Sequence, residues 1–191
     1  ILLTFNKLAI LLGFLSILTV LAYPFAKRFT YWPQFFLGIS FNWGILLAFA
    51  ASSNSLTIHA FALYTSGIFW TIFYDTIYSL QDIEDDKKVG IKSTAILFGS
   101  KTKVILIFFL LLITGIMSFL FFSVAGQDTV HLIILECGAF AFSVCLLMQL
   151  ITFNENDPKS CLRAFKANKQ AGLILASFLA IGTIYIKFYD Q

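Results

Sequence analysis

Six long apolar stretches make up most of this chain, and short polar hinges separate them. The stretches cover residues 8–23, 35–51, 58–80, 104–124, 132–153 and 171–188. A helix that crosses a bilayer needs about 20 mostly apolar residues. No stretch alternates between apolar and polar residues with a period of two, as strands do. We therefore expect an all-α fold, a multi-span transmembrane helical bundle, in a single domain over 1–191, with residues 1–6 as the tail of an earlier helix.

The composition agrees with a membrane environment. Hydrophobic residues make up 59% of the chain and charged residues only 12%, whereas soluble domains have about 25% charged residues. The formal net charge is +3, and no basic patch with interleaved aromatic residues is present. The sequence thus predicts a lipid bilayer as a partner and no nucleic acid.

The basic residues are concentrated in alternate hinges. Of the 13 Lys and Arg residues, all except Lys7 and Lys187 lie in the hinges at 24–34, 82–103 and 154–169. Six spans place these three hinges on one side of the membrane. Loops rich in Lys and Arg usually face the cytoplasm, so we expect these hinges to be cytoplasmic.

Five carboxylates lie near the end of the third stretch, four of them in the central basic hinge. The five are Asp75, Asp82, Glu84, Asp85 and Asp86. Charges near lipid persist mainly where they serve a function, and carboxylates suit Mg²⁺, which often binds substrate phosphates as well. If the helix continues through Asp86, Asp75, Asp82 and Asp86 lie within an arc of about 40°, with Tyr78 nearby and Glu84 facing away. A solvated acidic helix end remains the alternative interpretation of this spacing.

Cations and turn residues surround this acidic segment. Lys27, Arg28 and Lys92 are expected on the same membrane face, as the binding of a polyphosphate requires. Gly90 can end the acidic helix, and Ser93 or Thr94 can cap the next one. In the second stretch, Gly38, Ser40, Gly44 and Ala48 occur at roughly helical spacing, which favours close helix packing.

Three segments resemble a known family. The run at 74–99, YDTIYSLQDIEDDKKVGIKSTAILFG, resembles the second aspartate-rich motif of the UbiA family of membrane aromatic prenyltransferases. The runs YPFAKRFTYWPQ at 23–34 and LGISFNWG at 37–44 agree with it. The similarity extends in order through the whole chain and is greatest to the branch that prenylates 4-hydroxybenzoate in ubiquinone biosynthesis.

This resemblance implies a nine-helix bundle, of which the six stretches are helices four to nine. It implies transfer of a polyprenyl group from a polyprenyl diphosphate to the ring carbon ortho to the phenol of 4-hydroxybenzoate, with Mg²⁺ as the cofactor. The resemblance maps the second motif onto Asp82 and Asp86 and a basic pair onto Lys27 and Arg28. Together with the residues singled out above, the expected site is Asp82, Asp86 and Arg28 for catalysis, Asp82, Asp86 and Asp75 for the metal, and Lys27, Arg28, Asn42, Tyr78 and Lys92 for the substrates. The implied location is a bacterial inner membrane, or alternatively the mitochondrial inner membrane, with the site facing the cytoplasm.

The chain departs from the family pattern in one respect. The first aspartate-rich motif, NDxxDxxxD, is not among the 191 residues, which implies that the first three helices are missing and that an N-terminal complementing segment is a partner. The alternatives are a fragment, a split gene product or an inactive remnant. Other functions left open are a family enzyme for another acceptor, such as a naphthoate, haem or chlorophyll precursor, and a transporter or ion channel.

Overall fold

The computed structural model describes residues 1–189, and all regular structure in this part of the chain is helical. The long helices are α1 (Lys7–Phe29), α2 (Pro33–Ser53), α3 (Ile58–Ser79), α6 (Thr102–Ala125), α7 (Thr129–Thr152) and α8 (Pro158–Tyr189). The short elements are η1 (Leu2–Thr4), η2 (Leu80–Asp82), α4 (Ile83–Val89), α5 (Thr94–Phe98) and η3 (Gly99–Lys101). The all-α prediction is confirmed.

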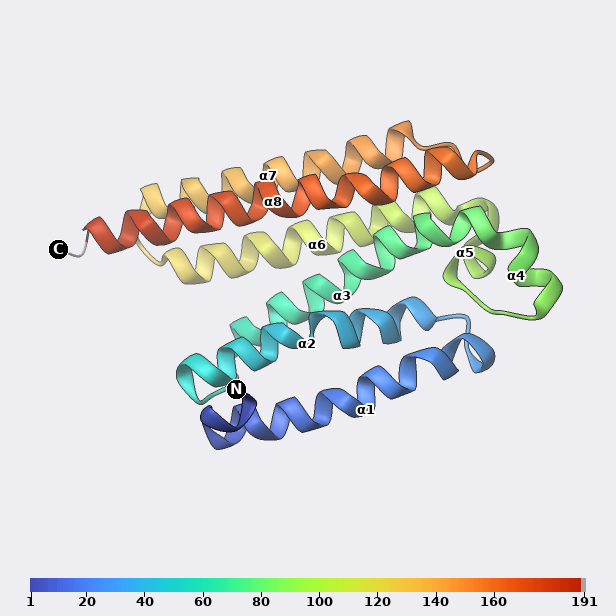
Figure 1. Ribbon diagram of the computed structural model, residues 1–191. Coiled ribbons are helices and arrows are strands. Elements are labelled where there is room, and N and C mark those ends of the chain that lie inside the picture. Colours follow the sequence, from blue (N-terminus) through green and yellow to red (C-terminus); the bar gives the residue numbers. More distant parts are fainter. Residues whose placement is uncertain (190–191) are drawn as a thin grey trace.

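The long helices lie alongside one another in the order α1, α2, α3, α6 and α7 (Figure 1). The last helix, α8, packs on α7 and also contacts α3, so that α3 has neighbours on several sides. The α1–α2 connection, the segment with α4 and α5, and the α7–α8 loop all lie at the same end of the bundle (Figure 1). The three basic hinges therefore share one end, as the sequence predicts.

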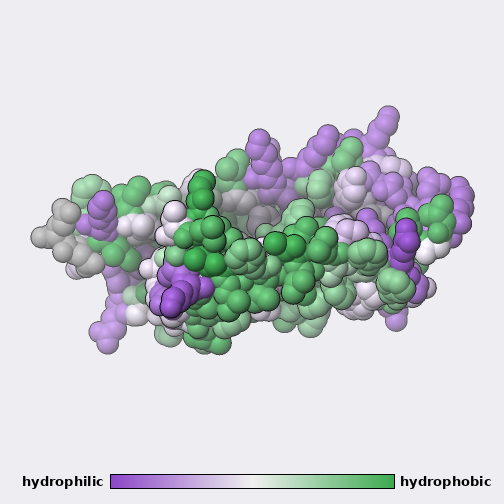
Figure 2. All heavy atoms as spheres, turned by 60° about the horizontal axis from the view of Figure 1, so that its bottom comes forward, coloured by the Kyte–Doolittle hydropathy of each residue, from purple (hydrophilic) through white to green (hydrophobic). Residues whose placement is uncertain are grey.

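Among the described residues, five helical segments are long and apolar enough to cross a membrane. They are Lys7–Phe29, Pro33–Ser53, Thr94–Ala125, Thr129–Thr152 and Pro158–Tyr189. The predicted third span, α3, has a suitable length of 22 residues but is less apolar, because it buries polar side chains such as Ser66, Thr71 and Thr76 among its neighbours. On the face shown in Figure 2, apolar side chains cover the middle of the molecule and hydrophilic ones gather toward the end with α4 and α5.

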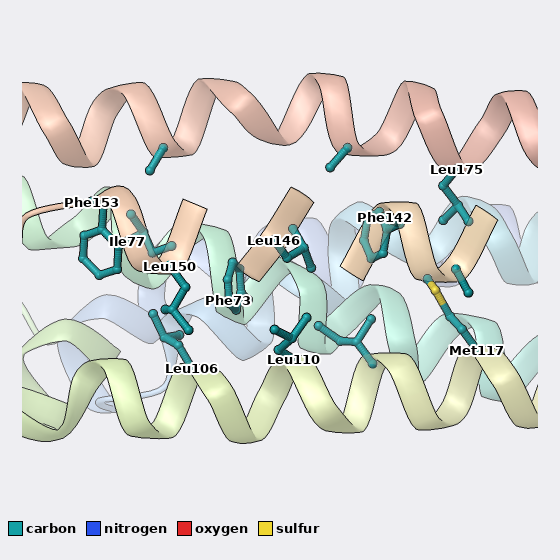
Figure 3. Close-up of a cluster of buried hydrophobic side chains, with 14 of the residues drawn as sticks. Phe73, Ile77, Leu106, Leu110, Met117, Phe142, Leu146, Leu150, Phe153 and Leu175 are labelled. Atoms are coloured by element: carbon teal, nitrogen blue, oxygen red, sulfur yellow. The ribbon is translucent and has the colours of Figure 1, made fainter. Parts of the chain in front are cut away.

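The main core fills the space between α3, α6, α7 and α8 (Figure 3). The labelled side chains are Phe73 and Ile77 from α3, Leu106, Leu110 and Met117 from α6, Phe142, Leu146 and Leu150 from α7, Phe153 after it, and Leu175 from α8. In contrast, α1 presents most of its apolar side chains outward, where lipid or another helix can contact them.

A close approach joins α2 to α3. A Cβ atom added to Gly38 would lie 3.1 Å from both the Cα and the carbonyl oxygen of Ile68, so a side chain there would press on backbone. Gly44 has open space around it. The close packing predicted from the small residues is confirmed at Gly38, whereas Gly44 does not take part in it.

The helix boundaries differ from the predicted hinges. The first helix continues through Pro24 to Phe29, and the last begins at Pro158, well before the predicted 171. Hydropathy detects only the lipid-facing part of a helix, whereas backbone hydrogen bonding carries a helix beyond the bilayer. Leu2–Thr4 form a 3₁₀ turn, and the Asn6 side chain caps α1 by accepting from the Ala9 N–H, so these residues are separate from α1. That they are the tail of an earlier helix stays a prediction.

Candidate functional site

The acidic hinge is not one continuous helix. Helix α3 ends at Ser79, a 3₁₀ turn spans Leu80–Asp82, and α4 covers Ile83–Val89. The prediction of a regular helix through Asp86 is therefore wrong. The 3₁₀ turn packs against α8, and this tertiary contact together with the tighter turn interrupts the regular helical phase.

A small pocket nevertheless collects most of the predicted site residues. Its volume is about 100 Å³. It is lined by Tyr23, Lys27, Gln34, Asp75, Tyr78, Ser79, Asp82, Asp86, Ile91, Lys92 and Ser93. The structure thus brings Asp75, Asp82 and Asp86 to the lining of one pocket. Glu84 and Asp85 instead line a separate hollow, about 490 Å³ in volume, beside the α7–α8 loop.

Gln34 connects the elements around this pocket. Its side-chain oxygen accepts from the Thr94 N–H at 3.1 Å, and its Nε2 donates to Ser79 Oγ at 3.4 Å. A hydrogen bond of 2.6 Å between the hydroxyl groups of Thr76 and Thr94 also joins α3 to the start of α5. Because Gln34 is buried, these bonds satisfy its amide and hold α2, α3 and the start of α5 together.

Lys92 holds the loop between α4 and α5 against α1. Its backbone N–H donates to the Lys27 carbonyl at 3.0 Å, and its ammonium donates to the Phe29 carbonyl at 3.3 Å. Gly90 ends α4 with φ of 74°, and the Ser93 side chain accepts from the Ile96 N–H at the start of α5. The predicted helix stop at Gly90 and the cap at Ser93 are confirmed.

The pocket carries interacting carboxylates close to cations. Burial raises the pKa of the Asp86 carboxyl above its ordinary value, Lys27 opposes this shift, and the charges of Asp82 and Asp85 add to it. Carboxylates that repel one another in this way favour a cation between them.

The carboxylate oxygens suit a hard cation such as Mg²⁺, which keeps water and phosphate ligands alongside one or two carboxylates. Within residues 1–189, no three His, Cys, Asp or Glu side chains form a group that could hold a metal ion. The donor set therefore fits a cation held by the pair Asp82 and Asp86 that draws its other ligands from a bound substrate. A role for Asp75 as a ligand stays a prediction.

A second cavity, of about 640 Å³, lies between α2, α3 and α8. It is lined by Phe41, Asn42, Trp70, Thr71, Tyr74, Phe165, Lys166, Asn168 and Lys169. Asn42 Nδ2 donates to Thr71 Oγ1 at 2.9 Å, and Trp70 Nε1 donates to Asn168 Oδ1 at 2.9 Å. These bonds fix polar side chains of a cavity whose lining also includes the aromatic Phe41, Trp70, Tyr74 and Phe165.

Aromatic contacts connect the two cavities. The Phe165 ring packs against Tyr74 at 5.7 Å and against Tyr78 at 4.7 Å between ring centroids. Tyr74 lines the larger cavity and Tyr78 lines the smaller, acidic pocket. The Phe165 ring therefore contacts a side chain of each cavity.

One predicted site residue lies outside both cavities, and some residues that line the cavities were not predicted from the sequence. Arg28 is exposed on the last turn of α1 and lines neither cavity, so its role stays a prediction. Sequence reasoning did not identify Gln34, Lys166 or Lys169 as site residues. A signal for Gln34 exists, because a polar residue directly after a proline at the start of an apolar stretch needs a partner when it is buried.

The chain is similar to proteins of a known family. The profile of the UbiA prenyltransferase family matches residues 1–185. The mitochondrial 4-hydroxybenzoate polyprenyltransferase of Drosophila melanogaster is 41% identical over 94% of this chain and 45% of its own length. The 4-hydroxybenzoate octaprenyltransferase of Psychromonas ingrahamii is 37% identical over 94% of this chain and 61% of its own length. The chain thus spans about half the length of these relatives.

A solved structure has the same fold. The apo structure of a UbiA homolog from Aeropyrum pernix K1 superposes with a TM-score of 0.70. The two sequences are 20% identical, and the match covers 94% of this chain and 66% of that one. At this identity the likeness establishes the helical arrangement alone.

Proposed function

The chain belongs to the UbiA prenyltransferase family, and we propose that it forms part of a Mg²⁺-dependent 4-hydroxybenzoate polyprenyltransferase of ubiquinone biosynthesis. The enzyme transfers a polyprenyl group from a polyprenyl diphosphate to the ring carbon ortho to the phenol. The names of the relatives, from an insect mitochondrion and from a bacterium, support this acceptor. They equally support a bacterial or a mitochondrial inner membrane as the location.

The observation that carries the proposal is the acidic pocket with its cations. Asp82 and Asp86 line it together with Lys27 and Lys92. Carboxylates alone would repel a diphosphate, and cations alone would bind any anion. The two together fit a diphosphate that arrives with a divalent cation, because the lysines contact its oxygens while the carboxylates hold the cation.

In this arrangement the chain's own residues bind and orient the leaving group. Lys27 and Lys92 hold the diphosphate at the end of the bundle, so that the prenyl carbon attached to it points toward the apolar interior. Mg²⁺ held by Asp82 and Asp86 would neutralise negative charge on the departing diphosphate. The bond between carbon and diphosphate oxygen breaks, a new carbon–carbon bond forms to the ring, and the ring loses the proton from that carbon.

The larger cavity between α2, α3 and α8, which we call the aromatic cavity, suits the acceptor. Trp70, Tyr74 and Phe165 provide faces against which a flat ring can pack. Lys166 and Lys169 line the same cavity and supply positive charge for a carboxylate. A benzoate bound there would place its ring beside Tyr74, next to the aromatic contact that leads to the acidic pocket.

The test is prenyl transfer by the chain completed with the N-terminal helices of the Psychromonas ingrahamii relative. With Mg²⁺, a polyprenyl diphosphate and 4-hydroxybenzoate, Asp82→Ala and Asp86→Ala should each lower kcat/KM by about 100-fold or more, because each removes charge from the leaving-group site. Glu84→Ala is the matched control, since Glu84 lines a different hollow, and we expect it to keep most activity. Equal losses in all three variants would contradict the proposal.

A further inference from the structure

A three-residue segment between α4 and α5 brings Lys92 to the acidic pocket. We call this segment, Lys92–Thr94, the strap. At its first residue, the Lys92 N–H donates to the Lys27 carbonyl on α1 at 3.0 Å. At its last residue, the Thr94 N–H donates to Gln34 Oε1 on α2 at 3.1 Å. Ser93 between them is extended, with φ of −149° and ψ of 161°. The strap is therefore a short extended segment whose backbone is held at both ends.

The bond from Gln34 is hard to replace. Thr94 is fully buried, and Gln34 is 2% exposed, so water does not reach the Thr94 N–H. A buried N–H that loses its partner carries the full cost of desolvation. Without the Gln34 amide, the strap has to shift until that N–H finds another acceptor. Because Lys92 is only two residues away, its side chain moves with the strap.

The same amide also bonds to the part of the pocket that carries the carboxylates. Gln34 Nε2 donates to Ser79 Oγ at 3.4 Å, at the end of α3, and the 3₁₀ turn with Asp82 follows directly. Gln34 itself is well fixed, since it lies in the first turn of α2 directly after the buried Pro33. One side chain thus joins the strap to the segment that holds the carboxylates. The pocket is only about 100 Å³, so a small shift changes which oxygens Lys92 can reach.

We propose that Gln34 is a positioning residue for the diphosphate, which it affects through Lys92 and not by contact. Its two amide atoms already bond to Thr94 and Ser79. By holding the strap, it sets the distance between the Lys92 ammonium and a cation held by Asp82 and Asp86. The inference rests on the diphosphate site proposed above. The competing explanation is that Gln34 contributes only to the stability of the fold.

The first experiment measures binding without chemistry. The completed enzyme is titrated with farnesyl thiodiphosphate, whose bridging sulfur slows departure of the leaving group, in the presence of Mg²⁺, and calorimetry gives the Kd. We expect Gln34→Met, which keeps the unbranched shape, to raise the Kd by about 3- to 10-fold, the range that one hydrogen bond supplies. Gln170→Met is the matched control on the exposed surface of α8 and should leave the Kd unchanged. An unchanged Kd in Gln34→Met, or an equal rise in Gln170→Met, would overturn the proposal.

A double-mutant cycle tests whether Gln34 acts through Lys92. Lys92→Met should raise the Kd by about 10-fold or more, because a charged hydrogen bond is lost. Adding Gln34→Met to that variant should raise the Kd by less than about twofold more, since no ammonium is left to position. A further rise as large as that in the single variant would show that Gln34 acts independently of Lys92 and would contradict the proposal.

The kinetics of prenyl transfer separate positioning from loss of folded protein. With saturating polyprenyl diphosphate, Gln34→Met should keep more than about half of the wild-type kcat while the KM for this substrate rises. A fall in kcat with an unchanged KM would support the stability explanation instead. If Gln34→Met does not fold, Gln34→Asn, whose amide is one methylene too short to reach Thr94, takes its place with the same expected outcomes.

The binding assay also keeps this inference separate from the proposed reaction. A wild-type enzyme that binds the thiodiphosphate but transfers no prenyl group to 4-hydroxybenzoate would refute the proposed function alone, and the mutant cycle would still test Gln34. A wild-type enzyme that binds no thiodiphosphate would overturn both.

Discussion

At the scale of single residues, the two neighbouring cations at the end of α1 illustrate how geometry separates similar candidates. Lys27 and Arg28 differ by about 100° around the helix. Lys27 lines the acidic pocket, and its charge reaches Asp86. Both side chains are exposed, but Arg28 lines neither cavity. The described structure thus favours Lys27 as the cation for a diphosphate.

We therefore predict unequal effects when each charge is removed from the completed enzyme. Lys27→Met should raise the KM for the polyprenyl diphosphate by about 10-fold or more, because a charged hydrogen bond is lost. Arg28→Met is the matched control and should change this KM less than threefold. Steady-state kinetics with each substrate varied in turn measures both. A larger effect of Arg28→Met, on either substrate, would return Arg28 to the binding site that its sequence motif implies.

At the scale of helices, the position of α3 depends on how closely α2 can approach it. Gly38 sits against the backbone of Ile68, and on the next turn of α2 Asn42 covers Gly67 and donates to Thr71. Because α3 carries Asp75 and Tyr78, a shift of this helix pair would also move the wall of the acidic pocket. The packing of small residues therefore contributes to the geometry of the site.

Gly38→Val should destabilise the α2–α3 pair. The added methyl groups meet backbone that cannot rotate away, and overpacking of this kind costs about 1–3 kcal/mol. Gly44→Val is the control on the same helix, because the space around Gly44 is open, and it should leave the stability unchanged or raise it slightly. Thermal unfolding in detergent, followed by tryptophan fluorescence, compares the two. An equal melting temperature for both variants would contradict the close approach.

At the scale of the whole molecule, the shared end of the three hinges leads to a prediction of sidedness. This end carries Lys27, Lys92 and Lys103, and the Lys103 ammonium also donates to the Phe153 carbonyl at 3.1 Å. In a bacterial inner membrane we expect it to face the cytoplasm. In a cysteine-free background, an impermeant thiol reagent added outside should label a Cys at exposed position 127 but not one at exposed position 88. Labelling of position 88 in intact cells would show that the orientation is the opposite of the one predicted.

A further prediction concerns the completeness of the site. The 191 residues hold one aspartate-rich motif, and they match only 45% and 61% of the length of the two relatives. We expect these residues expressed alone to insert into the membrane but to show no prenyl transfer, because one carboxylate pair leaves the charge on the departing diphosphate poorly stabilised. Co-expression of an N-terminal piece with NDxxDxxxD should restore activity, since helices can associate after separate insertion. Robust turnover by the 191 residues alone would refute this.

Much of the fold follows from local features of the sequence. Apolar length alone located all six long helices, because the cost of an unpaired backbone group in lipid forces such stretches into helices. Gly90 and Ser93 act through their own backbone and side-chain preferences, so their roles were predictable. The aspartate-rich run identified the acidic segment for the same reason, since its residue types and spacing are visible without a partner.

Other features depend on contacts between residues far apart in the chain. The 3₁₀ break before α4 arises where that turn meets α8, and Gln34 finds its partners at Ser79 and Thr94. The difference between Lys27 and Arg28 is equally invisible to a local pattern. Hydropathy and motif spacing act within one helix, whereas the shape of a cavity is set by which helices become neighbours. The sequence by itself determined the helices and the acidic motif, and only the tertiary structure decided which side chains meet.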